Sequence, residues 1–194
     1  GLLTTCGLLN VGPAEINAIT GAAHDIHGNY TRLRAENIEF TAGWHSSDFY
    51  ACELRGKLAE ARLFGEQLSV ERTLSMALSQ PTIHLSTTVQ NLGDTPTPLM
   101  FLYHINLGFP LIRQGTRLTA TGTVYPRDDA ARIGLGTWAK YARPAPAYPE
   151  QVFFHHVKST EDELSYAALI QDDFGLQFTW HTDQLPYLTQ WKNT

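Results

Sequence analysis

The feature that most constrains the fold is an alternation of apolar and polar residues between positions 68 and 90. In Leu68–Leu78 and again in Ile83–Gln90, most alternate residues are apolar and most residues between them are polar. Side chains of a β-strand point in turn to its two faces, so this pattern predicts strands with one buried face. Gln80-Pro81 interrupts the pattern, because proline has no N–H to donate to a strand ladder. Two alternating runs around such a break are typical of antiparallel strands.

Other segments extend this β pattern over the whole chain. No segment has a sustained 3.6-residue period of helical length, and about ten short strands with turns between them predict an all-β protein, an antiparallel sandwich or barrel. The further predicted strands are Gly1–Gly12, which ends in a tight turn, Arg34–Phe40, Tyr50–Ala61, Glu150–Val157, and a hairpin of Tyr166–Ile170 with Leu176–His181.

Length and charge narrow the class of protein. The chain has 194 residues, which suits one domain over residues 1–194. Its net charge of −5 and the lack of a basic run exclude a typical nucleic-acid-binding protein. The apolar runs are shorter than the ~20 residues that cross a bilayer, so no membrane partner is expected.

The cysteines and the chain ends add two expectations. Cys6 and Cys52 lie far apart and in no metal-binding pair, so we expect reduced thiols in a cytoplasmic protein. The chain starts in an apolar segment and stops just after a strand-like one, whereas domain termini more often end in polar residues. We therefore expect a domain truncated at both ends, cut from a longer protein.

The segment Pro98–Ile112 is an almost unbroken apolar run with His104 and Asn106 near its centre. Both faces of this predicted strand carry apolar residues, so we expect it to be covered on both sides. A buried imidazole or amide must find a polar partner or lose free energy. His104 is then either a core histidine with a satisfied hydrogen bond or part of a ligand site with apolar walls.

The histidines do not form a convincing metal site. Possible ligands are the pair His24 and His27, and His155 with His156 beside Glu150. A zinc or iron site needs three or four converging groups, and this spacing does not specify one. His155 and His156 lie on opposite faces of one predicted strand, so both cannot point inward. We therefore predict no metal, although a metal-dependent β-barrel enzyme of cupin type remains an alternative.

Several polar residues instead lie within aromatic surroundings that suit a sugar. They are His27, His104, Glu150 and the segment Gln190-Trp191-Lys192. Sugar hydroxyls require hydrogen-bond donors and acceptors, and the C–H face of a pyranose packs on an aromatic ring. The sequence therefore favours a carbohydrate ligand.

Five blocks, spread over nearly the whole chain, carry a resemblance to a known family: Gly1–Gly12, Ile26–Ile38, Leu102–Ile112, Pro149–His155 and Leu185–Lys192. They resemble an uncharacterised bacterial family within the galactose mutarotase (aldose 1-epimerase) superfamily. This resemblance implies a large antiparallel β-supersandwich, of which the chain would be a fragment. It also implies an isomerase that interconverts the anomers of a monosaccharide or sugar derivative, with a small-molecule sugar as its partner and no cofactor.

The resemblance also implies roles for particular residues. His27-Gly28 is similar to the motif that contacts sugar hydroxyls, and His104 with Asn106 is similar to the central catalytic histidine, although the residues after it are spaced differently. Glu150 begins a segment similar to the acidic-x-x-aromatic motif whose carboxylate binds the sugar. Trp191 and Lys192 are expected to line the rim.

The resemblance leaves the catalytic base unassigned. In the mutarotases it is a glutamate on a strand that follows the one matched by residues 190–192, and no glutamate in this chain matches that motif. We expect the base beyond residue 194. A sugar site further requires His27, His104 and Glu150 to line one concavity. A sugar-binding or sensing module without catalysis remains an alternative, and neither the sugar nor the oligomeric state follows from the sequence.

Overall fold

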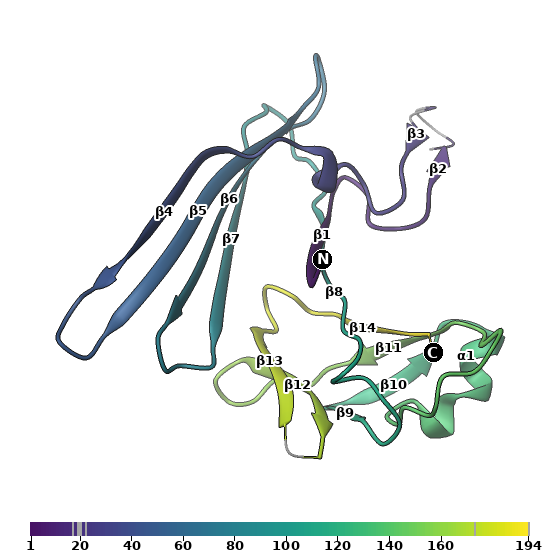
Figure 1. Ribbon diagram of the computed structural model, residues 1–194. Coiled ribbons are helices and arrows are strands. Elements are labelled where there is room, and N and C mark those ends of the chain that lie inside the picture. Colours follow the sequence, from purple (N-terminus) through teal and green to yellow (C-terminus); the bar gives the residue numbers. More distant parts are fainter. Residues whose placement is uncertain (17, 19–20, 22, 173, 194) are drawn as a thin grey trace. The chain divides into compact units, whose positions relative to one another are not determined.

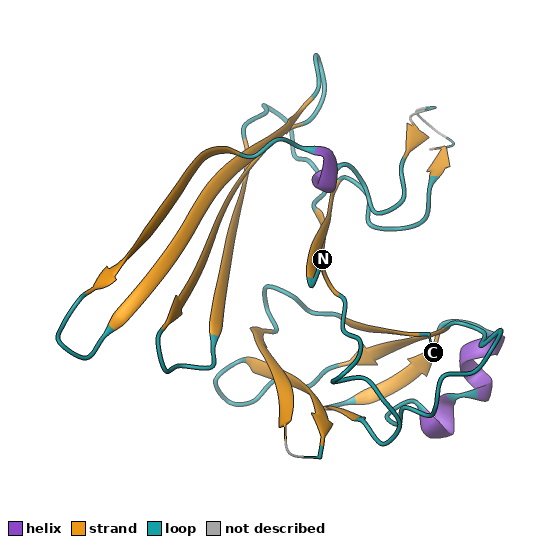
Figure 2. Cartoon of the chain, in the orientation of Figure 1, coloured by secondary structure: helices purple, strands orange, loops and turns teal. Residues whose placement is uncertain are grey.

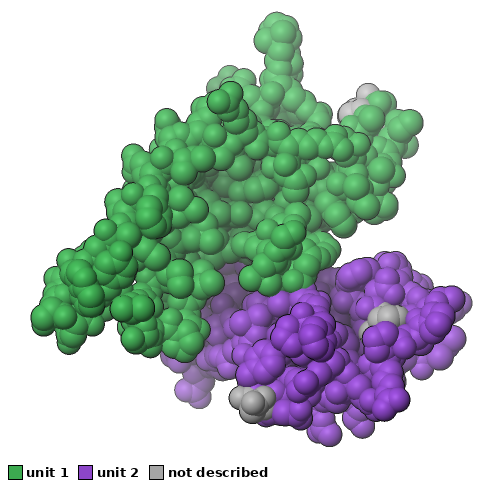
Figure 3. Space-filling view, in the orientation of Figure 1, with its two compact units in different colours: residues 1–106 green, residues 107–194 purple. Residues whose placement is uncertain are grey.

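The protein is described by a computed structural model that covers residues 1–16, 18, 21, 23–172 and 174–193. Strands dominate, and the helical segments within the described residues are short (Figure 2). The contacts divide the chain into two compact units, Gly1–Asn106 and Leu107–Thr194 (Figure 3). One domain over residues 1–194 stays a prediction.

Unit 1 contains a four-stranded antiparallel sheet in the order β4-β5-β6-β7 (Figure 1). Its register pairs Val70 with Val89 and Leu74 with Leu85, so the apolar residues of the two alternating runs share one face. The two strands predicted from the alternation are thereby confirmed. The strands are β4 (Glu36–Trp44), β5 (Tyr50–Ala61), β6 (Gln67–Ala77) and β7 (Ile83–Asn91).

A second, two-stranded pair in unit 1 joins β1 (Leu3–Leu8) to β8 (Met100–Ile105). The core of the unit forms where Leu8 and Tyr30 pack with Leu68 and Val70 of β6. Tyr30 belongs to the 3₁₀ turn η1 (Tyr30–Arg32). A short pair of strands, β2 (Glu15–Ile16) and β3 (Ala23–His24), completes the unit.

The strand predicted over Pro98–Ile112 is shorter and more exposed than expected. β8 ends at Ile105, whose partner Leu3 is the first residue of β1, so the ladder has no further strand residue to pair with. Gly108 and Pro110 then follow, and proline cannot donate to a ladder. Asn106 therefore lies just outside the strand. Among the described residues of unit 1, β8 pairs with β1 alone, and it is half-buried rather than covered on both faces.

Unit 2 contains two three-stranded antiparallel sheets, in the orders β10-β11-β14 and β13-β12-β9. The predicted hairpin is confirmed as β12 and β13, and Leu118 and Leu169 contribute to the core beneath it. No pattern in the sequence indicated the short helix α1 or the 3₁₀ turn η2. The elements are β9 (Arg117–Ala120), β10 (Thr123–Pro126), α1 (Asp129–Ile133), η2 (Leu135–Thr137), β11 (Gln151–His156), β12 (Leu164–Gln171), β13 (Phe174–His181) and β14 (Leu188–Lys192).

The helices and the two cysteines bear on two expectations from the sequence. In the described part of the chain, no helix has the length and apolar character needed to span a membrane. Cys6 is buried, Cys52 is half-buried, and both are free thiols.

Candidate functional site

Unit 1 brings together two of the histidines singled out in the sequence. The rings of His27, in the loop after β3, and His104, on β8, have centroids 5.5 Å apart and planes inclined at 64°. Both side chains are half-buried, so each ring keeps part of its surface open. The two imidazoles form an edge-to-face pair from segments more than seventy residues apart in the chain.

The His27 ring is held by its own loop in one tautomer. Its Nδ1 lies 3.0 Å from the carbonyl oxygen of Val11, and a carbonyl can only accept, so Nδ1 carries the hydrogen. Nε2 is then the free acceptor of the neutral ring. The backbone N–H of His27 donates to Gly12 over 2.9 Å, which fixes the residue at a positive φ of 62°. The loop thus presents the Nε2 edge in a defined direction.

The turn beside His27 depends on glycine. Gly28 has a φ of +76°, and a Cβ there would lie 2.4 Å from the backbone oxygens of both Gly7 and Asn10. Only a residue without a side chain allows this approach of the loop to β1. The requirement explains the glycine that follows His27.

A buried carboxylate from β5 supports the same loop, and the sequence analysis missed it. Glu60 is 5% exposed. It accepts a hydrogen bond of 2.8 Å from Asn29 Nδ2 and one of 3.2 Å from the backbone N–H of Leu8. It faces the same side of the sheet as its partner Leu68. A glutamate at an inward position of an alternating strand was the signal that could have revealed it.

Asn106 follows His104 closely in the sequence, and it bonds to the first residues of the chain. Its backbone N–H donates to Leu2 over 2.8 Å, and its Nδ2 donates to the carbonyl of Gly1 over 3.2 Å. The side chain is exposed, so Oδ1 remains able to accept a hydrogen bond.

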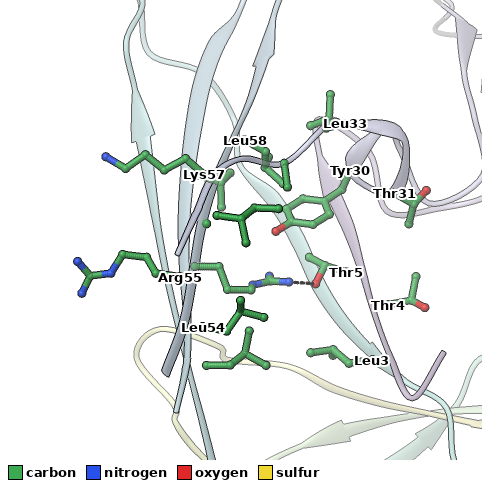
Figure 4. A pocket seen from close by; sticks show the side chains of 16 residues that line it. Leu3, Thr4, Thr5, Tyr30, Thr31, Leu33, Leu54, Arg55, Lys57 and Leu58 are labelled. Carbon is green, nitrogen blue, oxygen red and sulfur yellow. Dashed lines mark hydrogen bonds between the residues drawn. The ribbon is translucent and has the colours of Figure 1, made fainter. Parts of the chain in front are cut away.

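Unit 1 also contains an open pocket of about 430 Å³ between β1, η1 and the strands β5 and β6 (Figure 4). Arg72 lies on its wall, donates to Thr5 over 2.7 Å and to Thr87 over 3.1 Å, and stacks over the ring of Tyr30. Most of the other lining side chains are apolar, and those of Arg55 and Lys57 point away from the pocket in Figure 4. Arg72 thereby ties β1 to the four-stranded sheet.

In unit 2, Glu150 is clamped by two donors. Arg127 Nη2 donates to Oε1 and Trp191 Nε1 donates to Oε2, each over 2.8 Å. The side chain of Glu150 is 47% exposed, and the Trp191 residue is 50% exposed. The carboxylate and the indole ring therefore present an oriented acceptor beside an open aromatic surface.

The clamp is anchored to the neighbouring elements. Arg127 Nε donates to Asp128 over 2.8 Å, and Asp128 accepts from the Ala131 N–H as the N-cap of α1. The backbone N–H of Arg127 donates to Val152 of β11 over 2.9 Å. The hydrogen bond from Arg127, and next that from Trp191, lowers the pKa of Glu150 below its ordinary value. Glu150 is thus held as a carboxylate.

Lys192 does not share a surface with Trp191. Successive residues of a strand point to opposite faces, and Lys192 pairs with Gln151 on the buried side of β11 and β14. It is 4% exposed, and its Nζ donates to the carbonyls of Thr137 and Lys140 over 3.2 and 2.6 Å. Burial lowers the pKa of this amine. The ammonium supports the loop that contains η2.

The remaining histidines do not assemble ligands. His155 is buried at 3% exposure and packs edge-to-face on Trp138, whereas His156 on the other face of β11 is exposed, as the alternation predicted. Within residues 1–16, 18, 21, 23–172 and 174–193, no three His, Cys, Asp or Glu residues are grouped as a metal site would need.

The residues predicted from the sequence thus fall into two groups, one within each unit. Within unit 1 the structure joins His27 to His104, and within unit 2 it joins Glu150 to Trp191. Arg127 was missed because its role depends on a partner 23 residues away, and the sequence around it carries no recognisable motif.

A solved structure closely resembles the chain. It is the crystal structure of a "putative aldose 1-epimerase" from Klebsiella pneumoniae subsp. pneumoniae MGH 78578, with 28% sequence identity and a TM-score of 0.93. The match covers 100% of this chain and 50% of that one, so the chain spans half the length of the protein it resembles. The antiparallel architecture is that of the aldose 1-epimerase fold, as expected for a fragment of the supersandwich. No curated protein matches the sequence.

A family model extends the comparison to the sequence level. It is described as a domain of unknown function, DUF4432, and it matches residues 1–194. Because the match covers every residue, the chain belongs to this family.

Proposed function

We propose that the protein containing this chain is an aldose 1-epimerase that interconverts the anomers of a monosaccharide. The observation that carries the proposal is the pairing of His27 with His104, within a chain whose fold is that of a solved protein named for this activity. That protein's name supports the reaction class, and the two rings supply the chemistry in this chain.

His104 is the proposed general acid. It donates a proton to the ring oxygen of the sugar while a carboxylate base removes the proton of the anomeric hydroxyl. The ring opens, the bond to the aldehyde carbon rotates, and closure on the other face inverts C1. Imidazole suits the acid role because its ordinary pKa lies near physiological pH. We propose that the base is a glutamate outside the 194 residues.

His27, Asn106, Glu150 and Trp191 are the proposed sugar-binding residues. The Nε2 of His27 accepts from a hydroxyl, because Nδ1 already donates to Val11. Glu150 accepts from further hydroxyls, and the half-exposed indole of Trp191 packs on C–H groups. Lys192 is left out of this set, because its ammonium is bound by two carbonyls of the protein.

Anomer exchange tests the proposal. The product of the complete reading frame, mixed with freshly dissolved α-D-glucose or α-D-galactose, should speed exchange measured by NMR or polarimetry. His104→Ala should lower the rate by about 10²- to 10⁴-fold, the usual contribution of one positioned proton transfer. His84→Ala is the matched control, because His84 is exposed on the polar face of β7.

Two results would contradict the proposal. Equal rates for the parent and His104→Ala would remove His104 from the acid role. Sugar binding without any acceleration of exchange would favour a sugar-binding or sensing module on the same fold.

A further inference from the structure

Arg127 lies in unit 2, and neither the sequence patterns nor the comparisons single it out. Arg127 holds three groups at once: its Nη2 bonds to Glu150, its Nε to Asp128, and its backbone N–H to the carbonyl of Val152. Its own conformation is therefore fixed from the strand side and from the helix side. A guanidinium held in this way can position whatever it bonds to.

The carboxylate that Arg127 holds has acceptor capacity left over. Each oxygen of Glu150 receives one donor, from Arg127 or from Trp191, and a carboxylate has about four lone-pair sites. The half-exposed position leaves the remaining sites toward solvent. Two oxygens that each keep a free site match two neighbouring hydroxyl groups, which present two O–H donors side by side.

The charges around the clamp narrow the ligand further. Asp128 lies on the other side of Arg127, so two carboxylates flank one guanidinium. An added carboxylate or phosphate on the ligand would meet this negative charge, and like charges at close range repel. The uncharged face of Trp191 beside Glu150 favours C–H groups.

We infer that Arg127 is a positioning residue that fixes Glu150 as an ionised double acceptor, and that the subsite takes a vicinal diol of an uncharged sugar. The inference rests on the proposed function for the presence of a sugar, but the positioning of Glu150 does not. Glu150 is the group that touches the ligand, and Arg127 acts through it.

The first arm of the test needs no sugar. In the full-length protein with labelled tryptophan, the indole N–H resonance of Trp191, assigned with Trp191→Phe, reports the ionisation of Glu150 because the two are hydrogen-bonded. Arg127→Met should move the titration to higher pH, toward the ordinary glutamate value of about 4.3. Arg127→Lys, which keeps a positive charge, should restore part of the shift. Arg132→Met removes an exposed arginine paired with Asp129 and should leave the titration unchanged.

The second arm measures binding of D-galactose, D-glucose and the corresponding uronic acids by calorimetry. Arg127→Met should weaken binding of the neutral sugars about 10-fold. As the pH is lowered, the variant should lose binding at a higher pH than the parent does, because its Glu150 takes up a proton at a higher pH. Arg132→Met should bind as the parent does. The uronic acids should bind more weakly than the neutral sugars.

The two arms separate the possible failures. An unchanged Trp191 titration in Arg127→Met would overturn the positioning role, whatever the sugar data show. If Arg127→Met shifts the Trp191 titration as expected but the parent binds no sugar, the diol subsite and the proposed function are overturned while the positioning role stands. Tighter binding of uronic acids than of neutral sugars would overturn the assignment of an uncharged sugar alone.

Discussion

His155 and His156 are neighbours in sequence, yet β11 places one ring in the interior and the other in solvent. His155 packs on Trp138, and its Nε2 is buried without a hydrogen-bond partner in the described part of the chain. Burial lowers the pKa of His155, an effect that the side chain of Gln190 partly opposes. The folded protein therefore holds this ring neutral at pH values where an unfolded histidine binds a proton.

This shift predicts a specific acid sensitivity. Between the lowered pKa of the folded state and about 6.5, the unfolded chain binds more protons, so the free energy of unfolding falls as the pH falls. The contribution of His155 is at most about 1.4 kcal/mol per pH unit. His155→Phe, which keeps the aromatic packing, should remove this contribution. Urea unfolding at pH 7.5 and 5.5 measures it.

The neighbouring histidine supplies the control for that measurement. His156→Phe makes the same change on the exposed face of the same strand. It should leave the difference in stability between the two pH values as in the parent. If the free energy of unfolding falls equally between pH 7.5 and 5.5 in His155→Phe and in the parent, another group causes the fall.

At the scale of elements, the loop that carries His27 is fixed by its contacts with β1. Gly28 lies against the backbone oxygens of Gly7 and Asn10, and Glu60 of β5 joins β1 to the loop from the other side. The position of the His27 ring therefore depends on a glycine and a buried carboxylate that need not touch the ligand.

Gly28→Ala tests this dependence. The new methyl group would meet two carbonyl oxygens at a positive φ, which combines backbone strain with overpacking and should cost about 2–5 kcal/mol of unfolding free energy. Gly43→Ala in β4 is the matched control, because nothing lies within 4 Å of its added Cβ. That change should alter stability by less than about 1 kcal/mol. Thermal or urea unfolding of both variants decides the point, and equal stability would show that the loop relaxes freely.

The sequence predicted best those strands whose own side-chain pattern determines their position and their pairing. β6 and β7 alternate because each has one apolar face, and their register then follows from pairing like faces. β8 was predicted too long because an apolar run does not reveal where its partner begins, and Leu3 of β1 sets that limit. α1 has five residues, too few to show a helical period.

The residues of the candidate site also differ in whether the sequence could reveal them. His27, His104 and Glu150 could be singled out because each stands among aromatic or apolar neighbours in the sequence. Arg127 and Glu60 could not, because their partners are far away in the chain and only the folded register brings them within hydrogen-bond distance. Trp191 and Lys192 are adjacent in sequence, and the strand separates them onto opposite faces.

At the scale of the whole molecule, the activity depends on particular residues and not on the fold or the family alone. The chain matches half of a larger solved protein, and a fold by itself does not specify chemistry. The reaction needs both a proton donor and a base. His104 is the proton donor that we propose, whereas no glutamate in the sequence matches the base of the mutarotases.

Because we propose that the base is a glutamate outside the 194 residues, the proposed mechanism predicts how this chain behaves alone. A site that lacks one of two positioned groups can still bind but loses the rate contributed by that group. We expect the 194-residue chain alone to bind a monosaccharide weakly and to accelerate anomer exchange little. The product of the complete reading frame should be faster by at least the ~10²-fold typical of one acid–base group. NMR exchange on freshly dissolved aldoses compares the two proteins, with His104→Ala in the longer one as a reference for the loss of the acid. If the short chain matched the longer protein, the base would lie within these residues, and Glu150 would be the first carboxylate to replace with glutamine.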